Sequence, residues 1–391
     1  MKRIENAYKN KNRILSLQLL LAAFVIVIVL IAFDSCKSGR TGNYTLTMLL
    51  KAEGKTTETG MNSTIELIKK RLTTYGVPEK NITISFVKDE ISLKVEKADS
   101  TERLAVLAST TGNLEFWETY EYSDVYNFME AANKKASLTL YGDVAKKKAY
   151  LDSLKNLKAK VKVENKKVED TSSLVSKINN SDSQNGKKDD QSFAEFSIDN
   201  PLVAVLYPNF ENKNGKFYIV KGPVVGCAKI SDTARVNYIL SLPEVRNCFP
   251  YDIKFVWAIK PVDDLKSFLQ LLALKCTSRD GKAVIDGSVI TKAKQDVDPS
   301  GNYIISMEMN NEGARIWKRF TAENIDKSIA IVLDNYVYSY PLVNAEIPNG
   351  HSQLSGKFSK AEAEDLATVL TLGKLPYTLK IIKSESTEIK K

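Results

Sequence analysis

The chain has 391 residues, of which 43% are hydrophobic and 26% are charged, and its formal net charge is +9. This length and composition are typical of a globular protein with two or three domains. A basic total also occurs in nucleic-acid-binding proteins. The sequence contains no recognition-helix motif and no basic patch with interleaved aromatic residues, so we expect no nucleic acid partner.

Residues suited to catalysis are scarce. The one histidine, His351, lies in the polar segment "NGHSQLSG", which indicates an exposed turn. No GxSxG elbow or HExxH motif is present, and the carboxylates Glu362, Glu364 and Asp365 fall on an expected helix as a solvated face. We therefore expect a protein that is not an enzyme and has no cofactor.

The four cysteines are Cys36, Cys227, Cys248 and Cys276, and none has CxxC spacing. With a single histidine in the chain, a zinc site of Cys and His ligands is not expected. Cys227 and Cys248 are compatible with a disulfide in an oxidising compartment. Buried free thiols fit the sequence equally well, because spacing does not decide the redox state.

The N-terminal region contains an apolar run at 14–33, "ILSLQLLLAAFVIVIVLIAF", with no ionisable side chain. Twenty residues are enough to cross a bilayer as a helix. The preceding residues 1–13 carry five basic side chains and one acidic side chain. The positive-inside rule therefore predicts a cytoplasmic N-terminus, a single transmembrane helix in the bacterial inner membrane and a large body in the periplasm.

A second interpretation of this region remains open. The segment "AFDSCKSG" places Ser35 directly before Cys36, as in a relaxed lipoprotein cleavage site. In that case Cys36 would be lipidated and would anchor the chain in the envelope. The body lies outside the inner membrane in both interpretations.

The first part of the body shows a defined order of expected elements. They are a strand at 44–50, an amphipathic helix at 61–76, a hairpin at 81–97, a helix at 100–110 and a strand at 112–122.

The same order recurs near the C-terminus. There the expected elements are a strand at 302–310, a helix at 311–325, a hairpin at 329–341 completed by 352–359, a helix at 359–373 and a strand at 375–382. Strand, helix, hairpin, helix, strand is the order of a split βαβ, ferredoxin-like unit. The repeat therefore predicts an α+β fold with a base domain made of two halves.

The base halves are expected at 43–118 and 286–383, followed by a tail at 384–391. Between them, 119–285 is interpreted as an inserted α+β head domain. Within it, 146–192 is rich in Lys, Asp, Asn and Ser and poor in apolar residues, which predicts a mobile stretch.

Both halves contain motif residues, which are Arg71, Gly76, Val77, Asn81, Glu312, Gly313, Ala314, Thr321, Ala330, Asp334, Val337, Pro341, Gly350, Gly356, Ala363, Leu366, Leu375 and Pro376. In these motifs the chain resembles SecD of the SecD/SecDF protein-export family, in its first periplasmic region with the preceding transmembrane helix. The segment "TGNLEFWETYE" has the form associated with Bacteroidota. Most of 309–381 also follows the family pattern, although Asn335 replaces the usual glycine of the hairpin turn.

The resemblance implies an accessory subunit of Sec-dependent export that contacts unfolded secretory polypeptide, with 200–260 as the candidate surface. It implies SecDF, SecYEG or YidC-type translocon components as partners. The family's later transmembrane helices are not in the sequence, and the run at 14–33 has no charge for a proton relay. We therefore expect a chain without its own motor. The alternative is an anchored or lipidated adaptor that docks on SecDF, YidC or another envelope complex without binding substrate.

Overall fold

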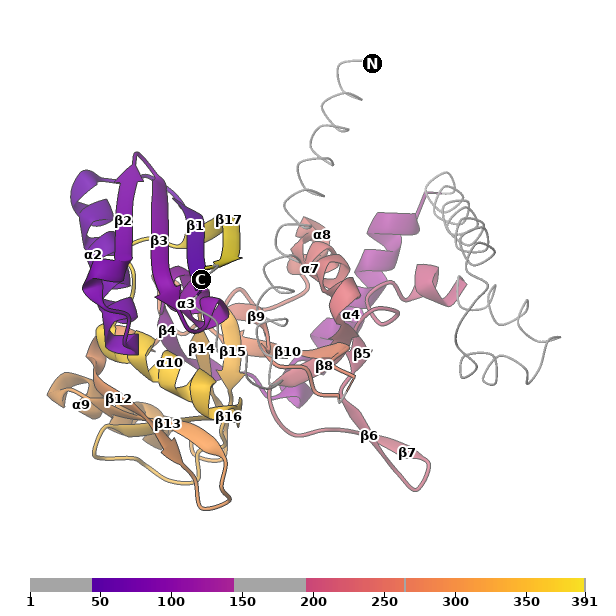
Figure 1. Cartoon of the computed structure of the whole chain (residues 1–391). Coiled ribbons are helices and arrows are strands. Elements are labelled where there is room, and N and C mark those ends of the chain that lie inside the picture. The colour runs from indigo at the N-terminus through magenta and orange to yellow at the C-terminus, as the bar shows by residue number, and fades with distance from the viewer. Residues whose placement is uncertain (1–43, 144–194, 264, 390–391) are drawn as a thin grey trace, which may run out of the picture. The chain divides into compact units, whose positions relative to one another are not determined.

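A computed structural model describes residues 44–143, 195–263 and 265–389 of the chain (Figure 1). These residues form two compact units. Unit 1 contains the described residues up to Glu118 and those from Thr277 onward, and unit 2 contains Thr119–Cys276. The expected transmembrane run 14–33 lies outside the described residues, as do Cys36 and all of 146–192.

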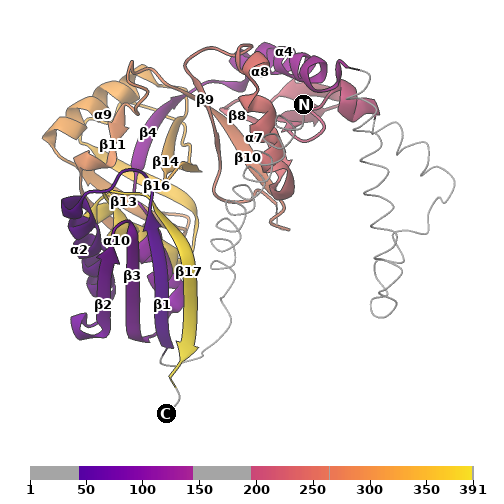
Figure 2. The ribbon, with the colours of Figure 1, turned by 90° about the horizontal axis from the view of Figure 1, so that it is seen from above.

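Unit 1 contains a four-stranded antiparallel sheet in the order β17, β1, β3, β2. Figure 2 shows these strands side by side. Their bounds are β1 Tyr44–Ala52, β2 Ile82–Val87, β3 Glu90–Ala98 and β17 Leu379–Glu388. Buried and exposed residues alternate along β1 and β3, so only one face of this sheet packs on the core.

Helices α2 (Glu58–Tyr75) and α3 (Thr101–Ser109) contribute to the same core as this sheet. Thr57 caps the start of α2 by accepting a hydrogen bond from the Gly60 amide at 3.2 Å. Gly76 ends the helix with φ of 116°, a left-handed conformation that glycine adopts without strain. Ser100 caps α3 in the same way as Thr57 caps α2. The helix expected at 61–76 therefore exists but begins three residues earlier.

The strand that closes this sheet is not the one expected. The strand expected at 112–122, last in the order of the first half, exists as β4 (Leu114–Thr119) but is not part of this sheet. Instead β17, from the C-terminal half, pairs with β1 along its whole length, from Tyr44 opposite Glu388 to Ala52 opposite Leu379. The two halves of unit 1 therefore share strands.

In the C-terminal half of unit 1, β12, β13 and β16 form an antiparallel sheet. In a second set of pairs, β14 lies between β15 and β4, and β4 also pairs with β11. The segment 352–359 was expected to complete the hairpin of β14 and β15, which is wrong, because β16 pairs with β13. The bounds are β11 Ile285–Asp286, β12 Ile290–Val297, β13 Tyr303–Met309, β14 Ile329–Leu333, β15 Tyr336–Ser339 and β16 His351–Phe358.

Helices α9 (Asn311–Glu323) and α10 (Lys360–Leu372) complete unit 1. A capping box of Ser359 and Glu362 starts α10. Val369 of α10 belongs to the core of the β1 sheet, while Leu366 and Leu370 belong to the core around β13 and β14. Helix α10 is therefore shared by both hydrophobic cores of unit 1.

In unit 2, strand β10 pairs with β8 and β9, and β8 pairs with β5. Strands β6 and β7 form a separate hairpin. The bounds are α4 Tyr122–Tyr141, β5 Tyr207–Pro208, β6 Phe210–Lys213, β7 Lys216–Ile219, β8 Val224–Lys229, α7 Thr233–Ser241, α8 Pro243–Arg246, β9 Ile253–Trp257 and β10 Phe268–Lys275.

Candidate functional site

A fully buried arginine lies where the two halves of unit 1 meet. Arg71, on α2, has no exposed surface. Its Nη1 donates to the carbonyls of Leu107 and Thr110, and its Nη2 donates to those of Thr111 at 3.2 Å and Gly373 at 2.7 Å. One side chain thus binds the ends of α3 and α10 and the segment that leads into β4.

The charge of Arg71 has no ion-pair partner within contact distance among the side chains that the structure describes. Burial lowers the pKa of the guanidinium to about 10, while the nearby Asp334 carboxylate opposes this shift. The Arg71 Nε also lacks a hydrogen-bond acceptor in the described part of the chain. Arg71 therefore satisfies backbone carbonyls at an electrostatic cost. We call such a side chain, which holds separate segments of the fold together, a structural tie.

Asp334 binds the other side of the same segment. Its Oδ2 accepts from the Gly112 amide at 3.1 Å and its Oδ1 from the Asn113 amide at 2.8 Å. Asp334 and Asn335 have φ of 50° and 67°, and they form the two-residue turn between β14 and β15. Asp334 therefore both shapes the hairpin turn and fixes the segment that Arg71 holds from α2.

An ion pair joins α3 to α10. The Arg103 Nε and Nη2 donate to the two carboxylate oxygens of Asp365 at 2.8 and 2.6 Å. Arg103 also lies 4.8 Å from the Tyr75 ring centroid. The hydrogen bond to Asp365 raises the pKa of Arg103, so the guanidinium stays charged. Asp365 was expected on a solvated face, which is wrong, because its side chain is only 10% exposed.

Two of the family-motif glycines lie together beside Met309. A Cβ on Gly313 would approach the Val289 Cβ to 2.6 Å, and one on Gly350 would approach the Ala314 Cβ to 2.7 Å. Both would also lie within 3.3 Å of the Met309 Cβ. These positions therefore require glycine for close packing of α9.

The other motif positions are spread over unit 1. Gly356 lies in β16, where an added Cβ would meet the Phe358 ring at 3.0 Å. The Pro341 carbonyl accepts from the Ile329 amide at 3.1 Å, and Pro376 borders a surface hollow. The structure therefore does not gather the motif residues into a single cleft.

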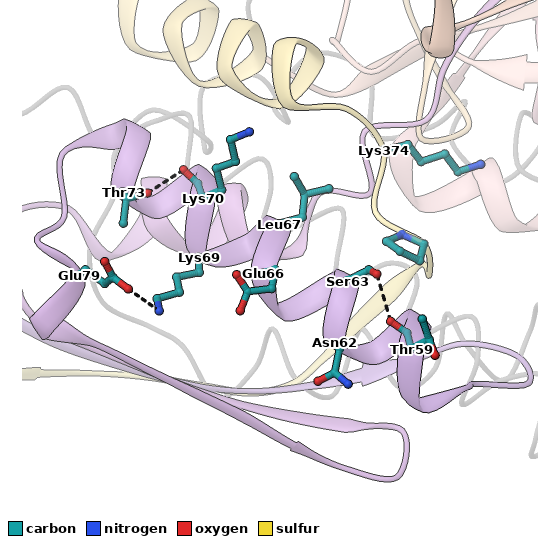
Figure 3. Close-up of a pocket in the computed structure, with 11 residues that line it drawn as sticks. Thr59, Asn62, Ser63, Glu66, Leu67, Lys69, Lys70, Thr73, Glu79 and Lys374 are labelled. Carbon is teal, nitrogen blue, oxygen red and sulfur yellow. Dashed lines mark hydrogen bonds and ion pairs between the residues drawn. The ribbon is translucent and has the colours of Figure 1, made fainter.

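That hollow, of about 850 Å³, runs along the outer face of α2 (Figure 3). Its charged groups are mixed, with Lys69 bound to Glu79 at 2.6 Å and Lys70 and Lys374 nearby. A smaller hollow of about 200 Å³ lies beside Gly112 and also includes Lys374. Neither contains the arrangement of nucleophile, base and orienting group that catalysis requires.

Unit 2 contains the segment 200–260, predicted as the substrate-contacting surface. The aliphatic side chains at 201–206 and 224–230 are mostly buried, including Leu202, Leu206, Val224 and Val225. The exposed large side chains of this segment are aromatic, and they are Tyr207 (44% exposed), Phe217 (71%), Tyr218 (47%), Tyr238 (46%) and Tyr251 (94%). Any contact surface in this segment is therefore aromatic, because most of the aliphatic side chains belong to the core of unit 2.

The three cysteines of unit 2 are free thiols, so Cys227 and Cys248 do not form a disulfide in this structure. Burial raises the pKa of the Cys227 thiol, which lowers its thiolate fraction relative to free cysteine. His351 is exposed, but it begins β16 and does not lie in a turn. Among the helices that the structure describes, none has the length and apolar character to cross a bilayer.

Comparison with known proteins places these features in a family context. The family model described as "SecDF, P1 head subdomain" matches residues 274–377. This match lies almost entirely in the C-terminal part of unit 1, and it overlaps the expected head insertion at 119–285 only at 274–285.

Two curated relatives are both named protein translocase subunit SecD. That of Rhodothermus marinus is 40% identical over 187 residues, which cover 48% of this chain and 28% of the relative. That of Dictyoglomus turgidum is 32% identical over 139 residues, which cover 34% of this chain and 35% of the relative. The matches thus span about a third of each relative's length. Such subunits are not enzymes, in agreement with the expectation for this chain.

A solved structure described as "Crystal structure of SecDF in Super-membrane-facing form" aligns with 96% of this chain and 35% of its own chain. Its TM-score is 0.44 and its sequence identity is 17%. The family match and the identity to two SecD subunits agree with the motifs found in the sequence. The chain carries a SecD-like periplasmic region.

Proposed function

We propose that this chain is an accessory subunit of Sec-dependent protein export whose body contacts translocating polypeptide in the periplasm. The observation that carries the proposal is the 40% identity to a SecD translocase subunit over 187 residues. The architecture is consistent with a binding role, because the family-motif residues described above stabilise unit 1 and form no reaction centre. The proposed partners are translocon components and unfolded secretory chains.

The proposal places the body at the outer face of the bacterial inner membrane. The apolar run at 14–33 would be the tether, as a single-pass helix or as a signal that precedes a lipidated Cys36. We assign no proton-driven step to this run, because it contains no ionisable side chain and a relay needs such groups within the membrane.

The proposed contact surface for substrate is the aromatic part of unit 2. Tyr207 and Tyr238 are exposed by 44% and 46%. Aromatic side chains offer a large contact area together with a polar group, which suits binding of varied sequences. Most of the neighbouring aliphatic residues are buried and serve the core of unit 2 instead.

Photocrosslinking in cells tests this assignment. A photoreactive amino acid at Tyr207 or Tyr238 of the full chain should give adducts with secretory precursors. The matched control is Val87, a 75% exposed residue of unit 1, where we expect few such adducts. Adducts with one envelope protein and none with precursors would instead support an adaptor that docks on SecDF, YidC or another complex.

The mass of the N-terminus tests the tether separately. An intact Met1 would show that the apolar run is retained as a helix. A diacylglyceryl group on Cys36 as the first residue would show lipidation, and the single-pass topology would then be wrong.

A further inference from the structure

The hairpin of β6 and β7 projects from the rest of unit 2 (Figure 1). It forms a sheet of two strands, with no third strand paired to it in the described ranges. Its turn is Asn214-Gly215, with φ of 54° and 80°, and the Gly215 amide donates to the Asn212 side chain at 2.9 Å. A two-stranded hairpin has little stability by itself, so its attachment to unit 2 decides whether it stays ordered.

The attachment is aromatic and lies at the base of the hairpin. The Phe210 ring centroid lies 6.1 Å from that of Tyr122 and 5.7 Å from that of Tyr126, both on α4. Phe217 lies on the same face of the hairpin as Phe210, because it pairs with Asn212, two residues along β6. Phe217 is nevertheless 71% exposed. Phe210 at the base of the hairpin therefore packs against α4, whereas Phe217 near the tip stays exposed.

Basic side chains lie next to the exposed phenylalanine along the chain, with the Lys213–Lys216 pair on the opposite face of the hairpin from Phe217. Lys213 and Lys216 flank the turn, and Lys221 follows β7, all three exposed. The only acidic residue of the hairpin, Glu211, binds Lys213 at 2.6 Å. The tip therefore combines an uncovered aromatic ring with an excess of positive charge, which indicates a partner that is acidic and also offers an apolar layer.

The strand edges of the hairpin are poorly suited to pairing with another chain. Each strand has only four residues, and lysines lie on both sides of the turn. Short, lysine-bearing edges are a common protection against strand addition. This favours recognition through the side chains of the tip over recognition through the backbone.

We propose that the β6–β7 tip docks on an anionic lipid bilayer, with its lysines among the headgroups and Phe217 at the boundary of the acyl chains. An anionic bilayer offers a negative layer directly above an apolar one, and aromatic and basic residues favour this interface. The inference rests on the proposed location of the chain at a membrane. It concerns residues of unit 2 other than Tyr207 and Tyr238.

Crosslinking at the tip tests the proposal in native membranes. A photoreactive amino acid replaces Phe217 in the full chain, and intact-mass spectrometry identifies the adducts. We expect phospholipid adducts at this position. The control position is Tyr251, which is also aromatic, lies in unit 2 and is 94% exposed. Protein adducts only, no adducts, or equal lipid adducts at both positions would overturn the proposal.

Purified full chain in vesicles tests the role of charge. Lys213→Gln with Lys216→Gln should lower the lipid adduct yield at position 217 about tenfold in vesicles containing phosphatidylglycerol, because each lysine near an anionic surface adds a several-fold gain. The yield should change little in phosphatidylcholine vesicles. Lys55→Gln with Lys80→Gln, two exposed lysines of unit 1, is the control.

Equal yields from the two double variants in phosphatidylglycerol vesicles would overturn the proposal. Failure of this inference is distinguishable from failure of the proposed function. Secretory precursors would still crosslink at Tyr207 or Tyr238 if only the lipid contact were wrong.

Discussion

The buried guanidinium of Arg71 donates hydrogen bonds to four backbone carbonyls. Its contribution to the free energy of unfolding therefore depends on the carbonyls that would lose a donor if Arg71 were replaced. The carbonyls of Leu107, Thr110, Thr111 and Gly373 come from segments that are up to 302 residues apart from Arg71 in sequence. A buried carbonyl without a donor costs free energy, and these four share one donor side chain. The desolvation of the guanidinium is offset by these bonds and by the nearby Asp334 carboxylate.

We expect Arg71→Met to lower the free energy of unfolding of unit 1 by about 3 kcal/mol, since it leaves buried carbonyls unsatisfied. Lys70→Met changes a neighbouring side chain of α2 that borders an open hollow, and we expect a change within about 0.5 kcal/mol. Urea unfolding followed by hydrogen exchange in β1 and β3 measures both. Equal stability of the two variants would show that Arg71 is not a structural tie.

Arg103 and Asp365 form a second tie, for which a double-mutant cycle gives the pairwise free energy. Their side chains are 30% and 10% exposed, so water screens the pair only in part. We expect a coupling free energy of about 1–2 kcal/mol between Arg103→Ala and Asp365→Ala. The more exposed pair of Lys360 and Glu364, 3.9 Å apart, should couple by less than about 0.5 kcal/mol. A coupling as small as this for Arg103 and Asp365 would contradict their role.

At the scale of elements, local signals in the sequence predicted the helices and hairpins well. Thr57, Ser100 and Ser359 cap three helices, and Gly76 ends one, through contacts within a few residues. The pairing of distant strands was not predictable in this way. Strand β17 replaces β4 beside β1, and β16 pairs with β13, because such pairings depend on which apolar faces meet in the core.

The difference between local and long-range contacts also applies to single residues of the site. The turn at Asp334 has a local sequence signal, but its bonds to Gly112 and Asn113 cross 222 and 221 residues of chain. The helical pattern around Asp365 also does not indicate which face of α10 meets Arg103. The sequence therefore indicated the family and the turn, while the two arginine ties required the structure.

The hairpin of β14 and β15 allows a test of turn chemistry. Asn335 has φ of 67°, a region that Asn and Gly tolerate and β-branched residues do not. We expect Asn335→Gly to change the free energy of unfolding by less than about 0.5 kcal/mol and Asn335→Val to lower it by about 1–3 kcal/mol. Thermal unfolding of the two variants measures the difference. A Val variant as stable as the Gly variant would contradict the observed turn.

At the scale of the whole molecule, the first and last described strands of unit 1 lie side by side. β1 pairs with β3 on one side and with β17 on the other, so the sheet is completed only by the C-terminal end of the chain. Leu375 and Leu379, which precede and begin β17, also belong to the core that contains Leu46 and Ile68. Unit 1 therefore depends on contacts between its two ends, whereas the strands β8, β9 and β10 of unit 2 lie within one continuous segment.

Removal of residues after Gly373 should consequently affect the two units differently. We expect loss of hydrogen-exchange protection in β1 and β3, because the truncated chain loses the β1–β17 bonds and the burial of Leu375 and Leu379. Protection in β8 and β9 should be retained, since both strands pair with β10 inside the continuous segment of unit 2. A truncation after Glu385 is the matched control, because it keeps Leu375, Leu379 and most of the pairs between β1 and β17. Retained protection of β1 after the longer deletion would show that unit 1 is stable without β17. An equal loss of hydrogen-exchange protection in both units would show that they do not unfold separately.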